Sequence, residues 1–181
     1  MVSVGIITII DNNNYGNRLQ NYALAHFIKQ NKVRVITLLN KPYYNLRGKY
    51  FFRKIKYSIL EKISFYQNNN ENAIRTENFK KFNQFIKFNN KVINPFFEKE
   101  KYDYYIVGSD QVWNPLMGRL RDVDLLNFTN TPNKIAYAAS TAISDKNIFD
   151  KKWIKNSWLK FKEISVREDR ARAPWRLRSI C

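Results

Sequence analysis

The stretch VSVGIITII (residues 2–10), followed by the polar loop DNNNYGN (residues 11–17), decides the fold of this chain. The first nine residues are rich in β-branched side chains and show no alternation, as expected for a strand covered on both faces. After the loop, a helical pattern runs to about Lys29, and residues 33–39 return to strand composition. The recurring helix residues are Leu19, Tyr22, Ala23, His26 and Phe27. This order predicts a βαβ unit, whose crossover between parallel strands is right-handed.

The rest of the chain continues the alternation of strands and helices. Residues 102–107, 134–139 and 163–166 have strand composition, while residues 71–90 and 150–161 have helical patterns. The expected apolar stripe of the first of these helices consists of Ile74, Phe79, Phe82, Phe85 and Ile86. We therefore expect one α/β domain over residues 1–168, with a Rossmann-like, mainly parallel sheet and flanking helices.

The composition limits the classes of function. With 181 residues, 44% of them hydrophobic, the chain can build a core and is not a disordered protein. The formal net charge of +17 predicts an anionic partner, which leaves nucleic acid, lipid headgroups and phosphorylated small molecules open. The single cysteine, Cys181, and the single histidine, His26, argue against a disulfide and against a metal site. His26 is interpreted as a half-buried structural residue of its helix.

The amino terminus lacks the basic start of a signal peptide, and no apolar run is long enough to span a bilayer. We therefore expect a cytoplasmic protein. The segment of residues 41–62 is basic and aromatic, and from Lys49 it can form an amphipathic helix. Such a helix either covers the sheet or makes peripheral contact with an anionic membrane at its inner face. No nucleic-acid-binding module is recognisable, so no nucleic acid is expected as partner.

The last residues differ from the rest of the chain in composition. Residues 167–181 hold five Arg and neither Lys nor Asn, whereas residues 1–166 hold 20 Lys, 23 Asn and seven Arg. One hypothesis is that the domain ends near Glu168 and that residues 169–181 arise from a shifted reading frame or a rearrangement. The alternative is a short, disordered basic tail.

Polar residues follow each predicted strand except the second, and ligands of open α/β sheets bind at the carboxyl ends of strands. Each cluster alone is equally typical of a turn. In the first loop, Gly16 allows a positive φ or a close approach to a ligand, and the helix after it points free N–H groups at the same space. The glycines of a dinucleotide fingerprint and the Lys-Ser/Thr ending of a phosphate loop are missing. In the later loop, Asp110 is suited to take a hydroxyl proton, and Trp113 either stacks on a sugar or packs in the core.

Four stretches resemble the polysaccharide pyruvyl transferase family, in the family's order and spread over residues 2–168. The first is NYGNRLQNYAL (residues 14–24), and the second is YIVGSDQVWN (residues 105–114). The third and fourth are KIAYAAS (residues 134–140) and ISVRE (residues 164–168).

This resemblance implies transfer of a pyruvyl group from phosphoenolpyruvate, the donor substrate, to a glycan or lipid-linked sugar, as in exopolysaccharide biosynthesis for the cell envelope. No cofactor is implied. Asp110 is the candidate catalytic base, and Arg167 is expected to balance the donor's charge. The remaining candidate substrate-binding residues are Asn14, Tyr15, Gly16, Gln20, Gly108, Ser109, Gln111, Trp113 and Ser140.

The resemblance also implies a fold similar to the amino-terminal half of a two-domain, glycosyltransferase-B-like arrangement. The second half, expected to supply basic residues for phosphoenolpyruvate, has no counterpart in these residues, so a second domain or a partner chain is expected. The alternative is a truncated, non-catalytic remnant that binds sugar without turnover.

Overall fold

A computed structural model describes residues 1–10, 14–40, 69–92, 101–143 and 150–167 of the chain. They form a six-stranded sheet with the strand order β3-β2-β1-β4-β5-β6, in which every pairing is parallel. The strands are β1 (Ser3–Ile7), β2 (Arg34–Leu39), β3 (Phe88–Val92), β4 (Tyr104–Asp110), β5 (Lys134–Ala139) and β6 (Glu163–Val166). The expected Rossmann-like α/β fold is confirmed.

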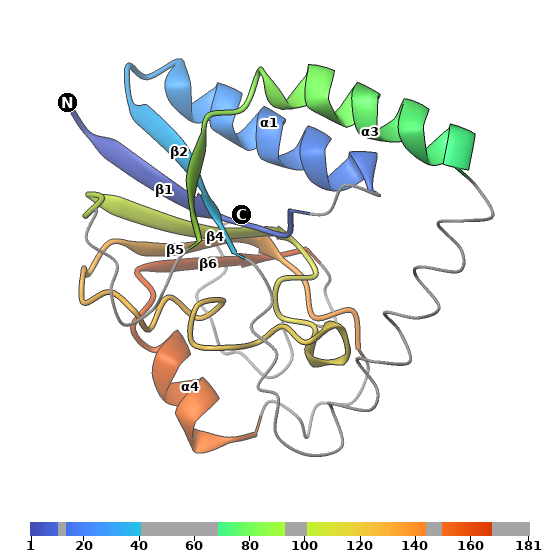
Figure 1. The fold of residues 1–181 in the computed structure, drawn as a ribbon. Coiled ribbons are helices and arrows are strands. Elements are labelled where there is room, and N and C mark those ends of the chain that lie inside the picture. Colours follow the sequence, from blue (N-terminus) through green and yellow to red (C-terminus); the bar gives the residue numbers. More distant parts are fainter. Residues whose placement is uncertain (11–13, 41–68, 93–100, 144–149, 168–181) are drawn as a thin grey trace.

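Helices cover both faces of the sheet (Figure 1). Helices α1 (Tyr15–Lys29) and α3 (Asn69–Asn83) lie side by side on one face, while α4 (Lys152–Trp158) lies on the other. A short 3-10 helix, η1 (Pro115–Met117), follows β4. The predicted helices after the loop of residues 11–17 and over residues 150–161 are therefore confirmed, with the first beginning earlier than expected, at Tyr15, and the second shorter than expected.

Strand β3 was missed, because residues 71–90 were predicted to be one helix. Helix α3 ends at Asn83, and residues 88–92 pair in parallel with β2. The sequence of this strand, FNNKV, contains asparagines and a lysine, which have low β-propensity. Its place at the edge of the sheet depends on main-chain pairing to a single neighbour. The expected stripe is buried only in part, since Phe79 and Ile86 are buried while Ile74 and Phe85 are exposed.

The predicted buried face of α1 was wrong. Leu19 and Phe27 are more than half exposed, and Ala23 is exposed as well. The face toward the sheet instead carries Asn17, Arg18, Asn21, Leu24 and Ala25. Two of its polar members contact neighbouring elements: Asn21 Oδ1 accepts a hydrogen bond from Thr37 Oγ1 of β2 (3.0 Å), and the Arg18 guanidinium lies 5.7 Å from the ring centroid of Phe79 in α3.

The interpretation of His26 as a half-buried residue is also wrong, because the side of α1 that carries His26 faces away from the sheet. His26 is exposed, and its ring stacks on Tyr22 with 5.6 Å between ring centroids. It therefore belongs to the outer surface of α1 and not to the core.

Two apolar clusters fill the spaces on either side of the sheet. Beneath α1, Leu24 and Ala25 pack on Val4, Ile6 and Ile106. The larger cluster lies on the opposite face, where Trp113 is fully buried and its ring lies 5.6 Å from that of Trp158. Since the central strands β1 and β4 are buried on both faces, the polar groups collect at the strand ends.

Lys134, the first residue of β5, lies in the core with 3% of its surface exposed. Burial, aided by the charge of Lys160, lowers the pKa of its ammonium group from 10.5 to about 8. Because the unfolded chain keeps the proton up to higher pH, the unfolding free energy should rise with pH between these two values. Lys134→Met should therefore stabilise the domain by about 1 kcal/mol at neutral pH, because the variant no longer buries an ammonium group.

Chemical denaturation of both proteins across this pH range measures that effect. The gain should shrink as the pH rises above 8 and should vanish well above pH 10.5, where the wild-type lysine is neutral in both states. The exposed Lys152→Met is the matched control, for which no such pH-dependent gain is expected. A destabilised Lys134→Met protein at neutral pH would contradict the account.

Two predictions concern residues outside the described ranges. The basic segment of residues 41–62 and the segment of residues 169–181 lie there, and so does Glu168. Within the described ranges, no helix is both long enough and apolar enough to span a membrane.

Candidate functional site

The candidate site lies at the carboxyl ends of β1 and β4, where the strand order of the sheet reverses. The chain places β2 and β3 on one side of β1 and places β4, β5 and β6 on the other. In a parallel sheet of this order, the loops leaving the two central strands diverge and open a crevice for ligands. The loops after β1 and β4 carry most of the residues predicted from the sequence.

The beginning of α1 forms one side of this site. Asn14 caps the helix, since its Oδ1 accepts a hydrogen bond from the N–H of Asn17 (3.4 Å). Gly16 does not adopt the positive φ considered for it; a Cβ there would lie 3.0 Å from the capping oxygen of Asn14. Tyr15 stacks on Phe79 with 4.4 Å between ring centroids, and Gln20 is half-buried. Glycine at position 16 thus leaves room for the cap.

The end of β4 has an unusual backbone. Gly108 has a φ of 124°, and a Cβ on it would lie 2.0 Å from the carbonyl oxygen of Tyr137 in β5. Positive φ also occurs at Asp110 (151°), at Ala138 (47°) and at Ala142 (50°). Such backbone costs free energy and often marks functional sites. Here it concentrates where β4 and β5 end.

Asp110 stands at the last position of β4, with 9% of its surface exposed. Its Oδ1 accepts a hydrogen bond from the N–H of Gln111 (2.8 Å), and its carbonyl oxygen accepts one from the N–H of Ser140 (2.9 Å). Among the described residues, its Oδ2 accepts no hydrogen bond. The carboxylate is therefore fixed on one oxygen and open to a ligand on the other.

Arg167 approaches Asp110 from the end of β6. Its Nη1 lies 4.0 Å from Oδ1 of Asp110, and its side chain is 39% exposed. The main chain of Arg167 is anchored by its N–H, which donates to the carbonyl oxygen of Ala139 (3.3 Å). The structure thus brings together Asp110, the candidate base, and Arg167, the residue expected to balance the donor's charge, from parts of the chain that are far apart in the sequence.

The other predicted residues after β4 and β5 divide into accessible and buried ones. Gln111 is half-buried, and its Oε1 accepts a hydrogen bond from Asn114 Nδ2 (2.8 Å). Ser109 is 8% exposed, while Ser140 is fully buried. Trp113 is also fully buried and donates from Nε1 to the carbonyl oxygen of Asp124 (2.9 Å). Trp113 therefore packs in the core, and the interpretation of its indole as a sugar platform is corrected.

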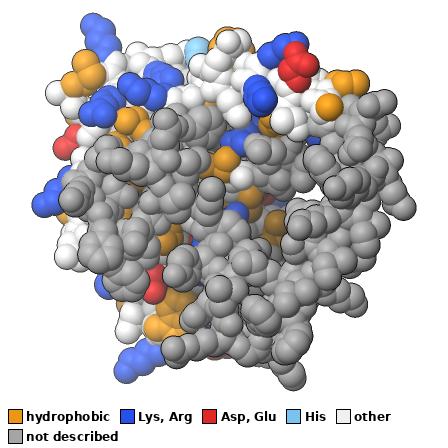
Figure 2. Space-filling model, in the orientation of Figure 1, with side chains coloured by type: hydrophobic (Ala, Val, Ile, Leu, Met, Phe, Trp, Pro, Cys, Tyr) orange, Lys and Arg blue, Asp and Glu red, His pale blue; other side chains and the backbone are white. Residues whose placement is uncertain are grey.

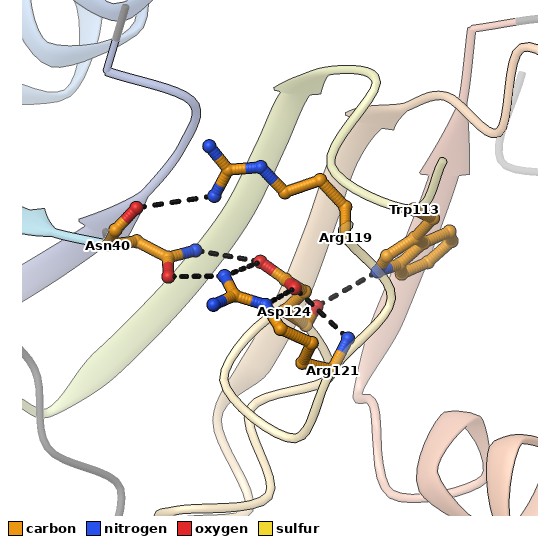
Figure 3. Close-up of polar contacts among 5 residues, drawn as sticks. All are labelled: Asn40, Trp113, Arg119, Arg121 and Asp124. Carbon is orange, nitrogen blue, oxygen red and sulfur yellow. Dashed lines mark hydrogen bonds and ion pairs between the residues drawn. The ribbon is translucent and has the colours of Figure 1, made fainter. Parts of the chain in front are cut away.

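A network around Asp124, which the sequence analysis missed, supports this edge (Figure 3). Asp124 has no exposed surface, and its Oδ2 accepts from Nε of Arg121 (2.9 Å), while its Oδ1 accepts from Nδ2 of Asn40 (2.7 Å). Arg121 Nη2 also donates to Asn40 Oδ1 (2.7 Å), and Arg119 Nη1 donates to the Asn40 carbonyl oxygen (3.2 Å). The network ties the residue after β2 to the loop after β4.

A compositional signal in the sequence pointed to this network. Only seven arginines precede residue 167, against 20 lysines in the chain, yet two of them occur within RLRD (residues 119–122). A guanidinium binds a carboxylate and an amide at once in a fixed geometry, which an ammonium cannot do. Arginine in a lysine-rich chain therefore indicates a geometric requirement.

We expect Asp124→Ala to lower the unfolding free energy by about 3 kcal/mol or more, because it leaves the Arg121 charge and the Asn40 amide without their buried acceptor. Chemical denaturation measures the loss. Asp122→Ala is the matched control, since that carboxylate accepts from Asn127 Nδ2 (3.0 Å) at an exposed position and should cost under about 1 kcal/mol. If both variants lose the same amount of unfolding free energy, the network around Asp124 does not stabilise the domain more than an exposed hydrogen bond does.

Within the described ranges, no group of three or more His, Cys, Asp or Glu side chains is placed to hold a metal ion. The polar groups that the described residues bring to this edge include the carboxylate of Asp110, the guanidinium of Arg167, neighbouring amides and hydroxyls, and the N–H groups that begin α1.

Comparison with known proteins gives one match. The family model described as polysaccharide pyruvyl transferase matches residues 14–180. No curated protein and no solved structure matches the chain.

Proposed function

The chain belongs to the polysaccharide pyruvyl transferase family, and from that premise we propose that it transfers a pyruvyl group from phosphoenolpyruvate to a sugar of a cell-surface polysaccharide. The observation that carries the proposal is the meeting of Asp110 and Arg167 at the carboxyl edge of the sheet. A carboxylate and a guanidinium at one place suit a reaction between a hydroxyl group and an anionic donor.

In the proposed reaction, two hydroxyl oxygens of one sugar bond to the central carbon of phosphoenolpyruvate. The bond between that carbon and the phosphate oxygen breaks, and the methylene carbon gains a proton to become a methyl group. The product is a pyruvate ketal, and the second hydroxyl proton leaves with inorganic phosphate. Every step depends on holding the sugar and the donor in a fixed relative position.

Asp110 is proposed as the base that takes the first hydroxyl proton. Its Oδ1 is held by the Gln111 N–H, which leaves Oδ2 to face the acceptor. The Arg167 side chain is 39% exposed, and its Nη1 lies 4.0 Å from Oδ1 of this carboxylate. Arg167 is proposed to bind the carboxylate or phosphate of the donor at this place.

The loop after β1 is proposed to bind the sugar on the opposite side of the crevice. Asn14 and Gln20 supply amide groups, and the exposed residues Tyr15 and Gly16 supply main-chain N–H groups for which the helix itself has no acceptors. Tyr15 is 43% exposed and offers a ring face or edge. The reaction is proposed to occur in the cytoplasm, where phosphoenolpyruvate is made.

The proposal is tested by incubating the purified protein with phosphoenolpyruvate and a panel of cell-surface glycans, while phosphate release is followed. We expect release that depends on an acceptor glycan, together with a new ketal methyl signal in the proton NMR spectrum of that glycan. Glycan binding without phosphate release would favour the alternative, a non-catalytic sugar-binding protein. If the protein neither binds a glycan nor releases phosphate, both the transferase and the sugar-binding proposals are contradicted.

A further inference from the structure

The outer surface of the α1–α3 layer carries apolar side chains that the fold leaves uncovered. On α1, Leu19 and Phe27 are 54% and 67% exposed, and they share one stripe because they lie two helical turns apart. On the α3 side, Phe85 is 56% exposed. Its ring lies 6.3 Å from that of Tyr22, one turn along α1 from Leu19. We call this surface the α1–α3 face.

The chain segments that carry these side chains are also basic. Residues 14–33 and 73–87 contribute exposed cations with a single described acid, Glu77, which pairs with Lys81 (3.0 Å). The exposed cations are Lys29, Lys32, Arg75, Lys80, Lys81 and Lys87. Figure 2 shows orange and blue side chains together along the rim where α1 and α3 lie. The face thus combines apolar side chains with an excess of positive charge.

Its charge indicates what covers this face. In a symmetric dimer, a second copy would set the same basic surface against itself, which places like charges opposite one another. An anionic partner is complementary to both the face and the net charge of +17. Two adjacent helices with separate, protruding apolar side chains and a basic surround fit the interface region of a bilayer, where apolar side chains enter between headgroups.

We propose that the α1–α3 face docks on an anionic lipid bilayer, with Leu19, Phe27 and Phe85 among the headgroups and the surrounding lysines against the lipid phosphates. The face lies on α1 and α3, away from Asp110 and Arg167 at the strand ends. Docking therefore requires no pyruvyl transfer, and its failure would leave the proposed function untouched.

Co-sedimentation with vesicles tests this docking. The full chain should bind vesicles of mixed phosphatidylglycerol and phosphatidylcholine, and should not bind vesicles of phosphatidylcholine alone. The triple variant Leu19→Gln, Phe27→Gln, Phe85→Gln should bind the anionic vesicles at least about tenfold more weakly, because it loses apolar insertion at constant charge. All three positions are exposed, so the variant should keep the wild-type circular dichroism spectrum.

The matched control replaces three exposed apolar residues elsewhere, Leu116→Gln, Met117→Gln and Leu159→Gln, which are 75%, 48% and 83% exposed. Its binding should stay close to wild type. A second pair of variants distinguishes charge on the α1–α3 face from charge elsewhere on the protein. Lys29→Glu combined with Lys80→Glu should abolish binding to the anionic vesicles. Lys151→Glu combined with Lys152→Glu, at the beginning of α4, should reduce that binding much less. Absence of binding to anionic vesicles, or equal losses within either matched pair, would overturn the proposal.

Discussion

Asp110→Asn should lower the turnover of pyruvyl transfer by about 10²- to 10⁴-fold, the usual contribution of a general base. The amide keeps the size of the side chain and an oxygen that can accept from the Gln111 N–H (2.8 Å in the wild type). The main-chain bond to Ser140 does not involve the side chain. Phosphate release measured at saturating substrates should therefore fall while the melting temperature changes little.

Two controls make this loss interpretable. Asp150→Asn removes an equally charged but exposed carboxylate, which pairs with Lys155 Nζ (2.7 Å), and should leave turnover unchanged. Asp110→Glu keeps a carboxylate, so its turnover should be higher than that of Asp110→Asn and should depend on pH as in the wild type. Unchanged turnover in a folded Asp110→Asn protein would remove Asp110 from the mechanism.

Gly108→Ala should give the largest loss of stability, about 4 kcal/mol or more, which is a large part of the total stability of an ordinary domain. A methyl group there would lie 2.0 Å from the carbonyl oxygen of Tyr137, so the main chain of β5 has to move. The φ of 124° adds strain for any residue with a Cβ. Thermal unfolding or proteolysis of the purified variant measures the loss.

Gly118→Ala separates the two causes. Gly118 also has a positive φ, 67°, at the end of η1, where alanine costs about 1 kcal/mol. If Gly108→Ala lowers the unfolding free energy no more than Gly118→Ala does, β4 and β5 do not approach each other as closely at Gly108 as described. The comparison matters for function as well, since Gly108 precedes Asp110 by two residues and fixes the path of the chain into the site.

The fold was largely predictable because its central strands have an unambiguous pattern. The stretch of residues 2–10 is rich in β-branched residues and shows no alternation, and the strand at 134–139 was predicted with its observed bounds. Strand β3 was not predictable in this way, since an edge strand made of FNNKV is held mainly by main-chain pairing to β2. Hydrophobic periodicity indicates which side chains are buried, but it does not predict main-chain pairing between strands.

The buried face of α1 shows a second limit of periodicity. Leu19, Ala23 and Phe27 form a regular apolar stripe, yet this stripe faces outward. Asn21 lies beneath the helix instead, where it accepts a hydrogen bond from Thr37 Oγ1 (3.0 Å). Near the ligand-binding edge of a sheet, polar residues can occupy buried positions if neighbouring strands supply partners, and a sequence pattern does not record those partners.

The sequence predicted where in the sheet the candidate site lies, but it predicted the side-chain contacts of the site residues less well. Polar residues at the ends of parallel strands have to share one edge, so Asp110 and Arg167 were expected at the same edge of the sheet, and the structure places Arg167 Nη1 4.0 Å from Asp110 Oδ1. Trp113 was assigned to the site as well, but its burial depends on packing against Trp158, which lies 45 positions later in the chain. The Asp124 network joins Asn40 to a loop 84 positions away, and local pattern does not reveal such a contact.

Hydrogen–deuterium exchange of the full chain, with and without phosphoenolpyruvate and an acceptor glycan, tests the central claim most directly. The account predicts slower exchange in peptides that contain the beginning of α1, residues 108–114, residues 139–141 and Arg167, with little change at the amino ends of the strands. Protection at the amino ends of the strands, or on the outer surface of α1 and α3 alone, would contradict a reaction site at the carboxyl edge of the sheet.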